Sequence, residues 1–306
     1  MDVFYFKIKS ESKEVGDFMK IKVVNKSIDQ KIFDNFKDKV YDMVFDISKK
    51  LNIDSDIIVN VCGNGTEKGV NGSCYSMKNR HIIYLYQHLF EREDDSLELV
   101  ILHELVHAKD AYLINKKKDN FKTYKTYKKD IDNYIIKTGF DTWTEFHAHF
   151  IVNKISNDYK FSYTTLKMVK KYEEILSIKD KIIQTIKNKK DYNELLSEYF
   201  KKIDEYIYMF STTMAANLFK NYNYEYVEKT QNKPAFKKVM KLYDKAYKLI
   251  GKMFHGTYGK HMEKRLFNIG YFIFDEFYYP LNIGIKKYRR GLDLCFFMER
   301  ESENNV

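Results

Sequence analysis

The chain is poor in cysteine and proline, and both scarcities limit the folds available to it. It has three cysteines and two prolines among 306 residues. A low, odd cysteine count argues against a disulfide framework and fits a reducing compartment. We therefore expect Cys62 and Cys74, which flank a glycine-rich turn, to be free thiols. Because proline interrupts helices, its scarcity together with 44% hydrophobic residues favours a folded, helix-rich protein.

The sequence also has no long uncharged apolar segment. No such segment reaches 18 residues, the length at which a membrane span is expected, and the best candidate, residues 266–285, contains Asp275 and Glu276. The first residues carry an early acidic side chain and no apolar core, unlike a signal peptide. We expect no membrane span and a cytoplasmic location, and such a sequence also permits secretion by a non-classical route.

Arginine is scarce, although the net charge of +10 would suit a nucleic-acid-binding protein. Only six of the 53 basic residues are arginine, whereas recognition of phosphates and bases favours the planar arginine fork. The lysines are spread over nearly every expected helix, as on solvated faces, and the lysine-rich stretch 116–129 is expected to be a solvated linker or helix. We expect a protein or peptide as partner and no nucleic acid, while the sequence leaves the oligomeric state open.

The most informative residues present are His-Glu-Leu-Val-His at 103–107, inside an expected amphipathic helix over 97–114. His103 and His107 are four residues apart, so a helix places them on one face. Two imidazoles one turn apart can bind a single zinc ion, and Glu104 then lies where it can activate a bound water molecule. The motif predicts a zinc hydrolase, with peptide bonds as the expected substrate.

The remaining pattern indicates an α+β fold. Strands are expected at 57–61, 73–77 and 81–87, and a helix at 27–51. Thr138 and Gly139 resemble a helix stop, after which Asp141 or Thr142 would cap a new helix ending at 155. Further helices are expected over 163–187, 191–220, 234–254, 260–277 and 282–299. The order predicts a core domain over 1–157 and a mostly α-helical region over 158–306.

A catalytic zinc needs a third protein ligand and an open position for water. The expected helix over 141–155 contains Glu145, His147 and His149, and each can bind zinc. Asp110 lies three residues after His107 on the same helix face, where its carboxylate could accept the second ring N–H of a ligand histidine. An ordinary charge near the end of the helix explains Asp110 equally well.

The sequence His103-Glu104-x-x-His107 followed by Glu145-x-x-Ala148 resembles the gluzincin metallopeptidases. It is similar in particular to the ImmA/IrrE-like peptidases and to anthrax-lethal-factor-like catalytic domains, over roughly residues 28–155. The resemblance implies a zincin-like core, made of a small mixed sheet and catalytic helices. It also implies one Zn²⁺ per chain, bound by His103, His107 and Glu145, with Glu104 as general base. The small Ala148 would let the two helices approach closely.

One position departs from the gluzincin pattern. Four residues after the glutamate the family often has Asp or Asn, and this chain has His149. His149 is therefore expected as an outer contact of the metal site or as an alternative ligand. Gluzincins also use a Tyr or His from outside the motif to stabilise the oxyanion. His255 and Tyr258, in a glycine-flanked segment, are the candidates here, with Tyr134 as a weaker rival and an ordinary loop as the alternative.

Together these features predict a zinc-dependent metallopeptidase that acts on a specific protein substrate. In zincins the strand before the catalytic helix borders the cleft, so strand 81–87 is expected to pair through a free edge with an extended peptide. The alternative is a regulatory or toxin-like binding protein whose zinc site is structural or vestigial.

Overall fold

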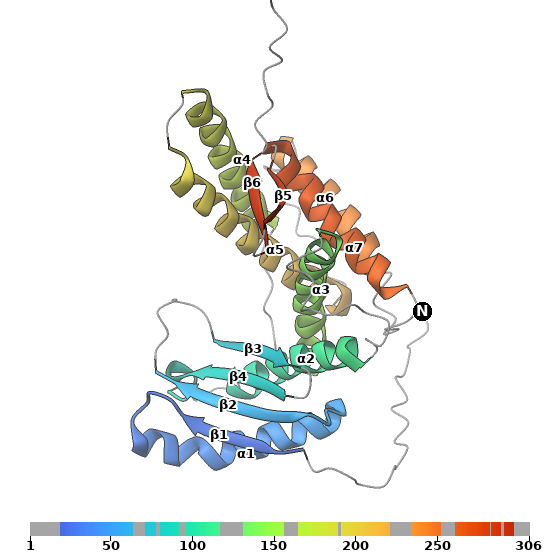
Figure 1. Ribbon diagram of the computed structural model, residues 1–306. Coiled ribbons are helices and arrows are strands. Elements are labelled where there is room, and N and C mark those ends of the chain that lie inside the picture. The colour runs from blue at the N-terminus through green and yellow to red at the C-terminus, as the bar shows by residue number, and fades with distance from the viewer. Residues whose placement is uncertain are drawn as a thin grey trace, which may run out of the picture.

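The chain folds into an α+β structure, seen in a computed structural model. The structure describes residues 19–63, 71–77, 80–91, 96–116, 131–155, 165–188, 191–220, 234–251, 261–281, 283–288 and 291–296. A sheet with two helices forms one part of the molecule, and a group of long helices forms the other (Figure 1). None of the described helices is long and apolar enough to cross a membrane.

The sheet has four strands in the order β1-β2-β4-β3. Strands β1 (Ile21–Asn25), β2 (Asp56–Cys62) and β4 (Arg80–Tyr86) are parallel, and β3 (Gly72–Met77) runs antiparallel to β4 at the edge. The three expected strands are confirmed to within one residue at each end. The expected free edge of strand 81–87 is wrong, because β4 lies between β2 and β3, so the edge on this side belongs to β3. Cys62 and Cys74 are free thiols, as expected.

Helices α1 (Gln30–Leu51) and α2 (Ser96–Lys116) cover one face of the sheet. Val59 of β2 and its register partner Ile83 of β4 are fully buried on that face, in one hydrophobic cluster with α1 and α2. Alternate residues of a strand point to opposite faces, so the intervening Ile58 and Ile82 lie on the other face, where they are half-buried. Asp29 caps α1 by accepting from two backbone N–H groups.

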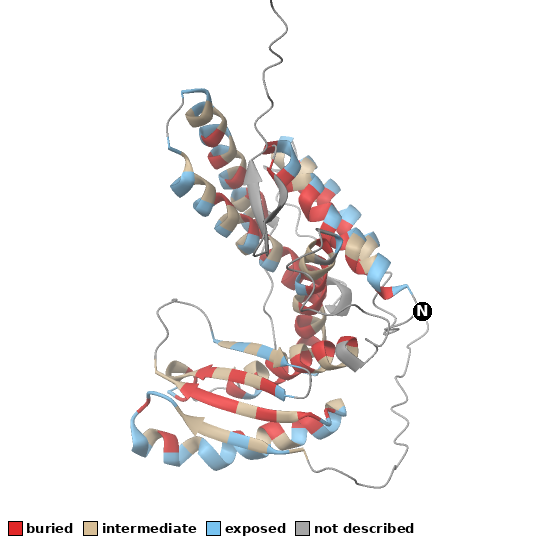
Figure 2. Ribbon diagram, viewed as in Figure 1, coloured by how far each residue is buried: buried red, intermediate tan, exposed pale blue. Residues whose placement is uncertain are grey.

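The helical part contains α3 (Ile131–Ile155), α4 (Thr165–Lys187), α5 (Asn193–Lys220), α6 (Pro234–Gly251) and α7 (Met262–Ile273), which continues as a π-helical turn (Phe274–Tyr278). Its buried residues form a second hydrophobic cluster (Figure 2). Helix α3 belongs to both clusters, since Phe140 and Trp143 pack with the helical part whereas Ala148 and Val152 pack with the sheet. The boundary expected near residue 157 lies outside the described residues and stays a prediction.

The expected helix stop at Gly139 is wrong, because α3 runs through this residue without a break. Gly139 lies where α3 crosses α7, and a Cβ atom placed there would come within 1.9 Å of the Leu266 carbonyl oxygen. The glycine is thus needed for the close approach of two helices. It does not provide the left-handed conformation of a helix end.

The helix expected over 282–299 is also wrong. This segment forms an antiparallel hairpin of β5 (Ile283–Tyr288) and β6 (Gly291–Phe296). Two glycines and a period-two alternation, as in Ile-Gly-Ile and Leu-Asp-Leu, favour strands over a helix. Of the lysine-rich stretch 116–129, Lys116 ends α2, and residues 117–129 lie outside the described residues.

Candidate metal centre

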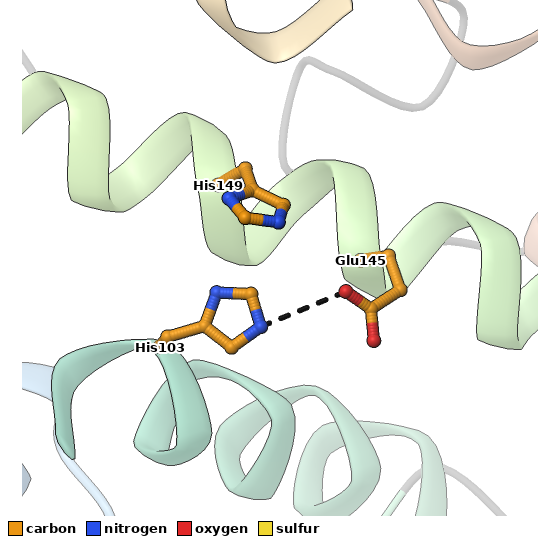
Figure 3. Close-up of side chains that lie close together, drawn as sticks. All are labelled: His103, Glu145 and His149. Atoms are coloured by element: carbon orange, nitrogen blue, oxygen red, sulfur yellow. Dashed lines mark ion pairs between the residues drawn. The ribbon is translucent and has the colours of Figure 1, made fainter. Parts of the chain in front are cut away.

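Four side chains with metal-binding atoms meet where α2 packs against α3. His103 and His107 come from α2, and Glu145 and His149 come from α3. Figure 3 shows His103 pointing up from α2 toward Glu145 and His149, which point down from α3. Ala148, which lies between Glu145 and His149 in the sequence, is fully buried. Its small side chain permits the expected close approach of the two helices. The structure therefore brings together the motif histidines and two of the three expected third ligands.

The donor atoms of His103, His107 and Glu145 lie close enough together to bind one metal ion. The two Nε2 atoms of His103 and His107 lie 3.0 Å apart. Glu145 places Oε1 3.4 Å from His107 Nε2 and Oε2 3.6 Å from His103 Nε2. A zinc ion at about 2.0–2.1 Å from each ligand would hold its donors about 3.3–3.4 Å apart. Among the described residues the buried Oε2 atom accepts no hydrogen bond, so the residues fit a cation at this point.

His149 is also close enough to bind the same ion. One donor atom from each of His103, Glu145 and His149 lies within 4.8 Å of the others, so these three residues could hold a metal ion. The rings of His103 and His149 have their centroids 4.6 Å apart. Both possible triads contain His103 and Glu145, and they differ in whether His107 or His149 completes the site.

A hydrogen-bonded chain behind His107 sets its tautomer. Thr144 donates its hydroxyl proton to Asp110 Oδ2 at 2.8 Å, and the same hydroxyl lies 2.9 Å from His107 Nδ1. Because the threonine proton is used on Asp110, the hydroxyl oxygen accepts from the His107 Nδ1–H group. The Nε2 lone pair of His107 then points at the metal site. Asp110 is thus linked to His107 through Thr144 and does not accept from its ring directly.

His147 belongs to this outer network. Its Nδ1 atom lies 2.9 and 3.0 Å from the two oxygens of the fully buried Asp110, and its ring stacks on Trp143 with a centroid distance of 5.0 Å. Of the three possible third ligands, His147 is the one that the structure places outside the donor cluster. The sequence did not point to Thr144, because its role depends on how α3 crosses α2.

The pKa shifts at Glu145, His107 and His149 favour the protonation states that a metal requires, whereas the shift at His103 opposes them. Burial opposes ionisation of Glu145, but the charges of His107 and His103 outweigh it and lower the Glu145 pKa to about 2. Burial lowers the pKa of His107 to about 4 and moves that of His149 well below its usual value. Burial also acts to lower the pKa of His103. The opposing effect of Glu145 is larger, so the His103 pKa lies above its usual value. An ionised carboxylate thus faces neutral imidazoles at His107 and His149.

Glu104 lies in a tight space between α2 and the edge strand β3. Its side chain is buried, and burial, reinforced by the charge of Glu145, raises its pKa to about 7. A Cβ atom on Gly72 would lie 3.0 Å from Glu104 Oε1 and 2.8 Å from Val100 Cγ1. Only a glycine lets the strand come this close, so the end of β3 lies directly beside the expected general base.

The structure adds a tyrosine that the sequence did not suggest. Tyr208 of α5 places its ring 5.4 Å from that of His149, edge to face, and its side chain is exposed. Tyr134 packs instead against Phe274 in the helical part, at 6.0 Å. The expected oxyanion residues His255 and Tyr258 lie outside the described residues and stay predictions.

Comparison with family models, curated proteins and solved structures finds no significant match to this chain. The resemblance to gluzincins therefore depends on the residues and on their geometry.

Proposed function

We propose that the protein is a zinc-dependent metallopeptidase of the gluzincin type. One observation carries the proposal: donor atoms of His103, His107 and Glu145 lie 3.0 to 3.6 Å from one another, close to the buried carboxyl group of Glu104. A structural zinc site has no need of such a carboxyl group, whereas a hydrolytic site uses it as a base.

The residues divide the chemistry among themselves. A bound zinc ion would polarise the substrate carbonyl group and lower the pKa of its bound water. Glu104 would accept the proton of the attacking water and pass it to the leaving amine. A pKa raised to about 7 suits both halves of this transfer near neutral pH. Tyr208 is the described residue best placed to donate a hydrogen bond to the oxyanion.

An extended segment of a protein substrate would bind along the edge strand β3. The outer edge of β3 has no partner strand among the described residues, and its Gly72 end contacts Glu104. A peptide that pairs with this edge would carry its main chain past the general base. The peptide-binding role expected for the strand at 81–87 is therefore assigned to the edge strand β3.

Metal analysis of the purified protein tests the site. We expect about one zinc per chain, lost in His103→Ala. Replacing the third ligand should weaken zinc binding by more than the roughly 100-fold limit for an outer partner, whereas replacing an outer residue should stay below it. Comparing the zinc affinities of Glu145→Ala and His149→Ala therefore shows which of the two residues is the third ligand. A protein without zinc would contradict the proposal.

The reaction is tested with Glu104→Gln, which removes the base and preserves the shape of the side chain. We expect loss of peptide hydrolysis, with zinc content and melting temperature close to those of the wild type. Because the enzyme can be specific for one protein, the assay should use a diverse mixture of unfolded proteins and detect new termini by mass spectrometry. Activity that survives in Glu104→Gln would show that this mechanism is wrong.

A closed structural site is the second candidate, and the position of His149 favours it. Four protein ligands, His103, His107, Glu145 and His149, would leave no open position for water. Cobalt substitution separates the two sites, because only an open site should change its visible absorption when a hydroxamate is added. An unchanged spectrum would favour the structural site.

A further inference from the structure

We propose that the outward face of β3 selects substrates with apolar or aromatic side chains at every second position. The inference rests on the proposed peptidase function and names its substrate class. The residues that would make the selection are Tyr75 and Met77 of β3, supported by Ile82 and Tyr84 of β4.

The side chains of β3 divide into two rows of different character. Small or short residues, Gly72, Cys74 and Ser76, point to the face covered by the helices and are half-buried. Ser73, Tyr75 and Met77 point to the uncovered face, where Tyr75 is 60% and Met77 42% exposed. Exposure of two large apolar side chains on an edge strand is a liability for a protein that has no use for it.

The uncovered face continues from β3 onto β4 without a charged residue at its centre. In the register of the two strands Tyr75 lies opposite Ile82, and Ser73 lies opposite Tyr84. Ile82 and Tyr84 are half-buried, so each still offers apolar surface beside the exposed β3 residues. Among the residues of β3 and β4 on this face, the charged one is Arg80, opposite Met77 at the far end of the pair.

The same edge is continuous with the metal centre. Gly72, at the start of β3, contacts Glu104, and Tyr75 and Met77 follow three and five residues later. At about 3.4 Å per residue, they lie roughly 10 and 17 Å along the strand from the base. A peptide added to the edge places side chains directly opposite Tyr75 and Met77, two positions apart. The intervening peptide side chain points to the helix-covered side, beside the small residues.

Peptide binding to zinc-loaded Glu104→Gln tests the inference without requiring hydrolysis. The first probe is a fluorescein-labelled dodecapeptide with phenylalanine at every second position and serine or glutamate between. The control peptide has the same composition with its phenylalanines in adjacent pairs. By anisotropy we expect the alternating peptide to bind more tightly, by up to about fivefold for each cross-strand pair. Its binding should also slow the hydrogen exchange of the β3 amides.

Variants then locate the effect. Adding Tyr75→Ala and Met77→Ala should abolish the difference between the peptides. Tyr41→Ala, at an exposed tyrosine on α1, should leave the difference unchanged. Equal affinities for the two peptides, or a difference that survives both substitutions, would overturn the inference. Failure of the wild-type protein to cut any peptide would count against the peptidase function alone, because the binding comparison still decides the role of β3.

Discussion

Gly139 of α3 and Gly270 of α7 lie against each other where the two helices cross. A Cβ atom on Gly139 would lie 1.9 Å from the Leu266 carbonyl oxygen, and one on Gly270 would lie 1.9 Å from that of Ile135. The backbones are therefore in contact, and this contact fixes the helix that carries Glu145 and His149 against the helical part of the molecule.

We predict that Gly139→Ala destabilises the protein, contrary to the usual effect of the exchange. Helix propensity alone would make alanine more stable by about 1 kcal/mol. Contact with a backbone carbonyl forces the helices apart, so we expect a net loss of at least about 2 kcal/mol, within the range for overpacking. Urea unfolding measures the change, and Asn268→Ala at an exposed α7 position is the control. A variant as stable as the wild type would show that the helices can separate at little cost.

Replacing Thr144 by valine should weaken metal binding while preserving the fold. The change removes the hydroxyl group between His107 and Asp110, so the imidazole loses the partner that sets its tautomer. We expect zinc affinity to fall roughly 10- to 100-fold, as measured by competition with a chromophoric chelator. Thr142→Val is the matched control, because its hydroxyl bonds only the Thr138 carbonyl of the same helix among the contacts described. Equal losses in the two variants would count against a specific role for Thr144.

Gly72→Ala should impair catalysis more than metal binding. The added methyl group would push against Glu104 and Val100 and displace the general base. Misplacement of a catalytic group by about 1 Å can cost roughly 100-fold in rate, so we expect a 10- to 100-fold loss of hydrolysis with about one zinc per chain retained. Ser73→Ala, at the neighbouring exposed position, should be close to the wild type.

The buried His81 should make the fold sensitive to acid. Its ring nitrogens lie 2.8 Å from the hydroxyl groups of Ser55 and Ser76, and burial lowers its pKa from 6.5 to about 4. Between these two pH values the unfolded chain binds a proton that the folded chain does not, so stability falls as the pH falls from 6.5 toward 4. At about 1.4 kcal/mol per pKa unit, the loss reaches about 3 kcal/mol.

The dependence on His81 can be isolated by substitution. In His81→Gln, the slope of unfolding free energy against pH between 6.5 and 4.5 should become flatter, whatever the absolute stability of the variant. The corresponding change at His88, which bonds Asn71 at the surface, should leave the slope as it is. A slope unaltered in His81→Gln would assign the acid sensitivity to other groups.

Tyr208→Phe tests the proposed oxyanion donor. Loss of such a donor costs roughly 100- to 1000-fold in kcat, and KM should change little. Tyr247→Phe, an exposed tyrosine of α6, provides the control. If Tyr258→Phe or His255→Ala shows the loss in kcat and Tyr208→Phe does not, the donor is the one expected from the sequence.

Features that depend on short sequence patterns could be predicted. The β-branched and aromatic residues in 81–87 and the apolar spacing around His103 predict β4 and α2 to within two residues. The four-residue spacing of His103 and His107 then placed two imidazoles on one face, as the structure has them. Glu145 and His149 are predicted as possible ligands because they lie on the next expected helix and their side chains can bind a metal.

The errors arose where a distant segment decides the local structure. The local sequence predicts a helix stop at Gly139. It does not show that the backbone of α7 packs against this residue, which is the reason for the glycine. The order of the strands decides which strand has the free edge. The local sequence of β4 does not show that β3 pairs with it. Thr144 gains its role only from the crossing of α2 and α3.

Helix α3 has its two ends in different hydrophobic clusters, and this limits how the protein can be divided. A chain cut after residue 155 would retain His103, His107, Glu145 and His149. It would also expose Phe140 and Trp143, because most of the hydrophobic cluster to which they belong comes from later helices. The candidate metal centre therefore cannot be transferred to another protein without the later helices.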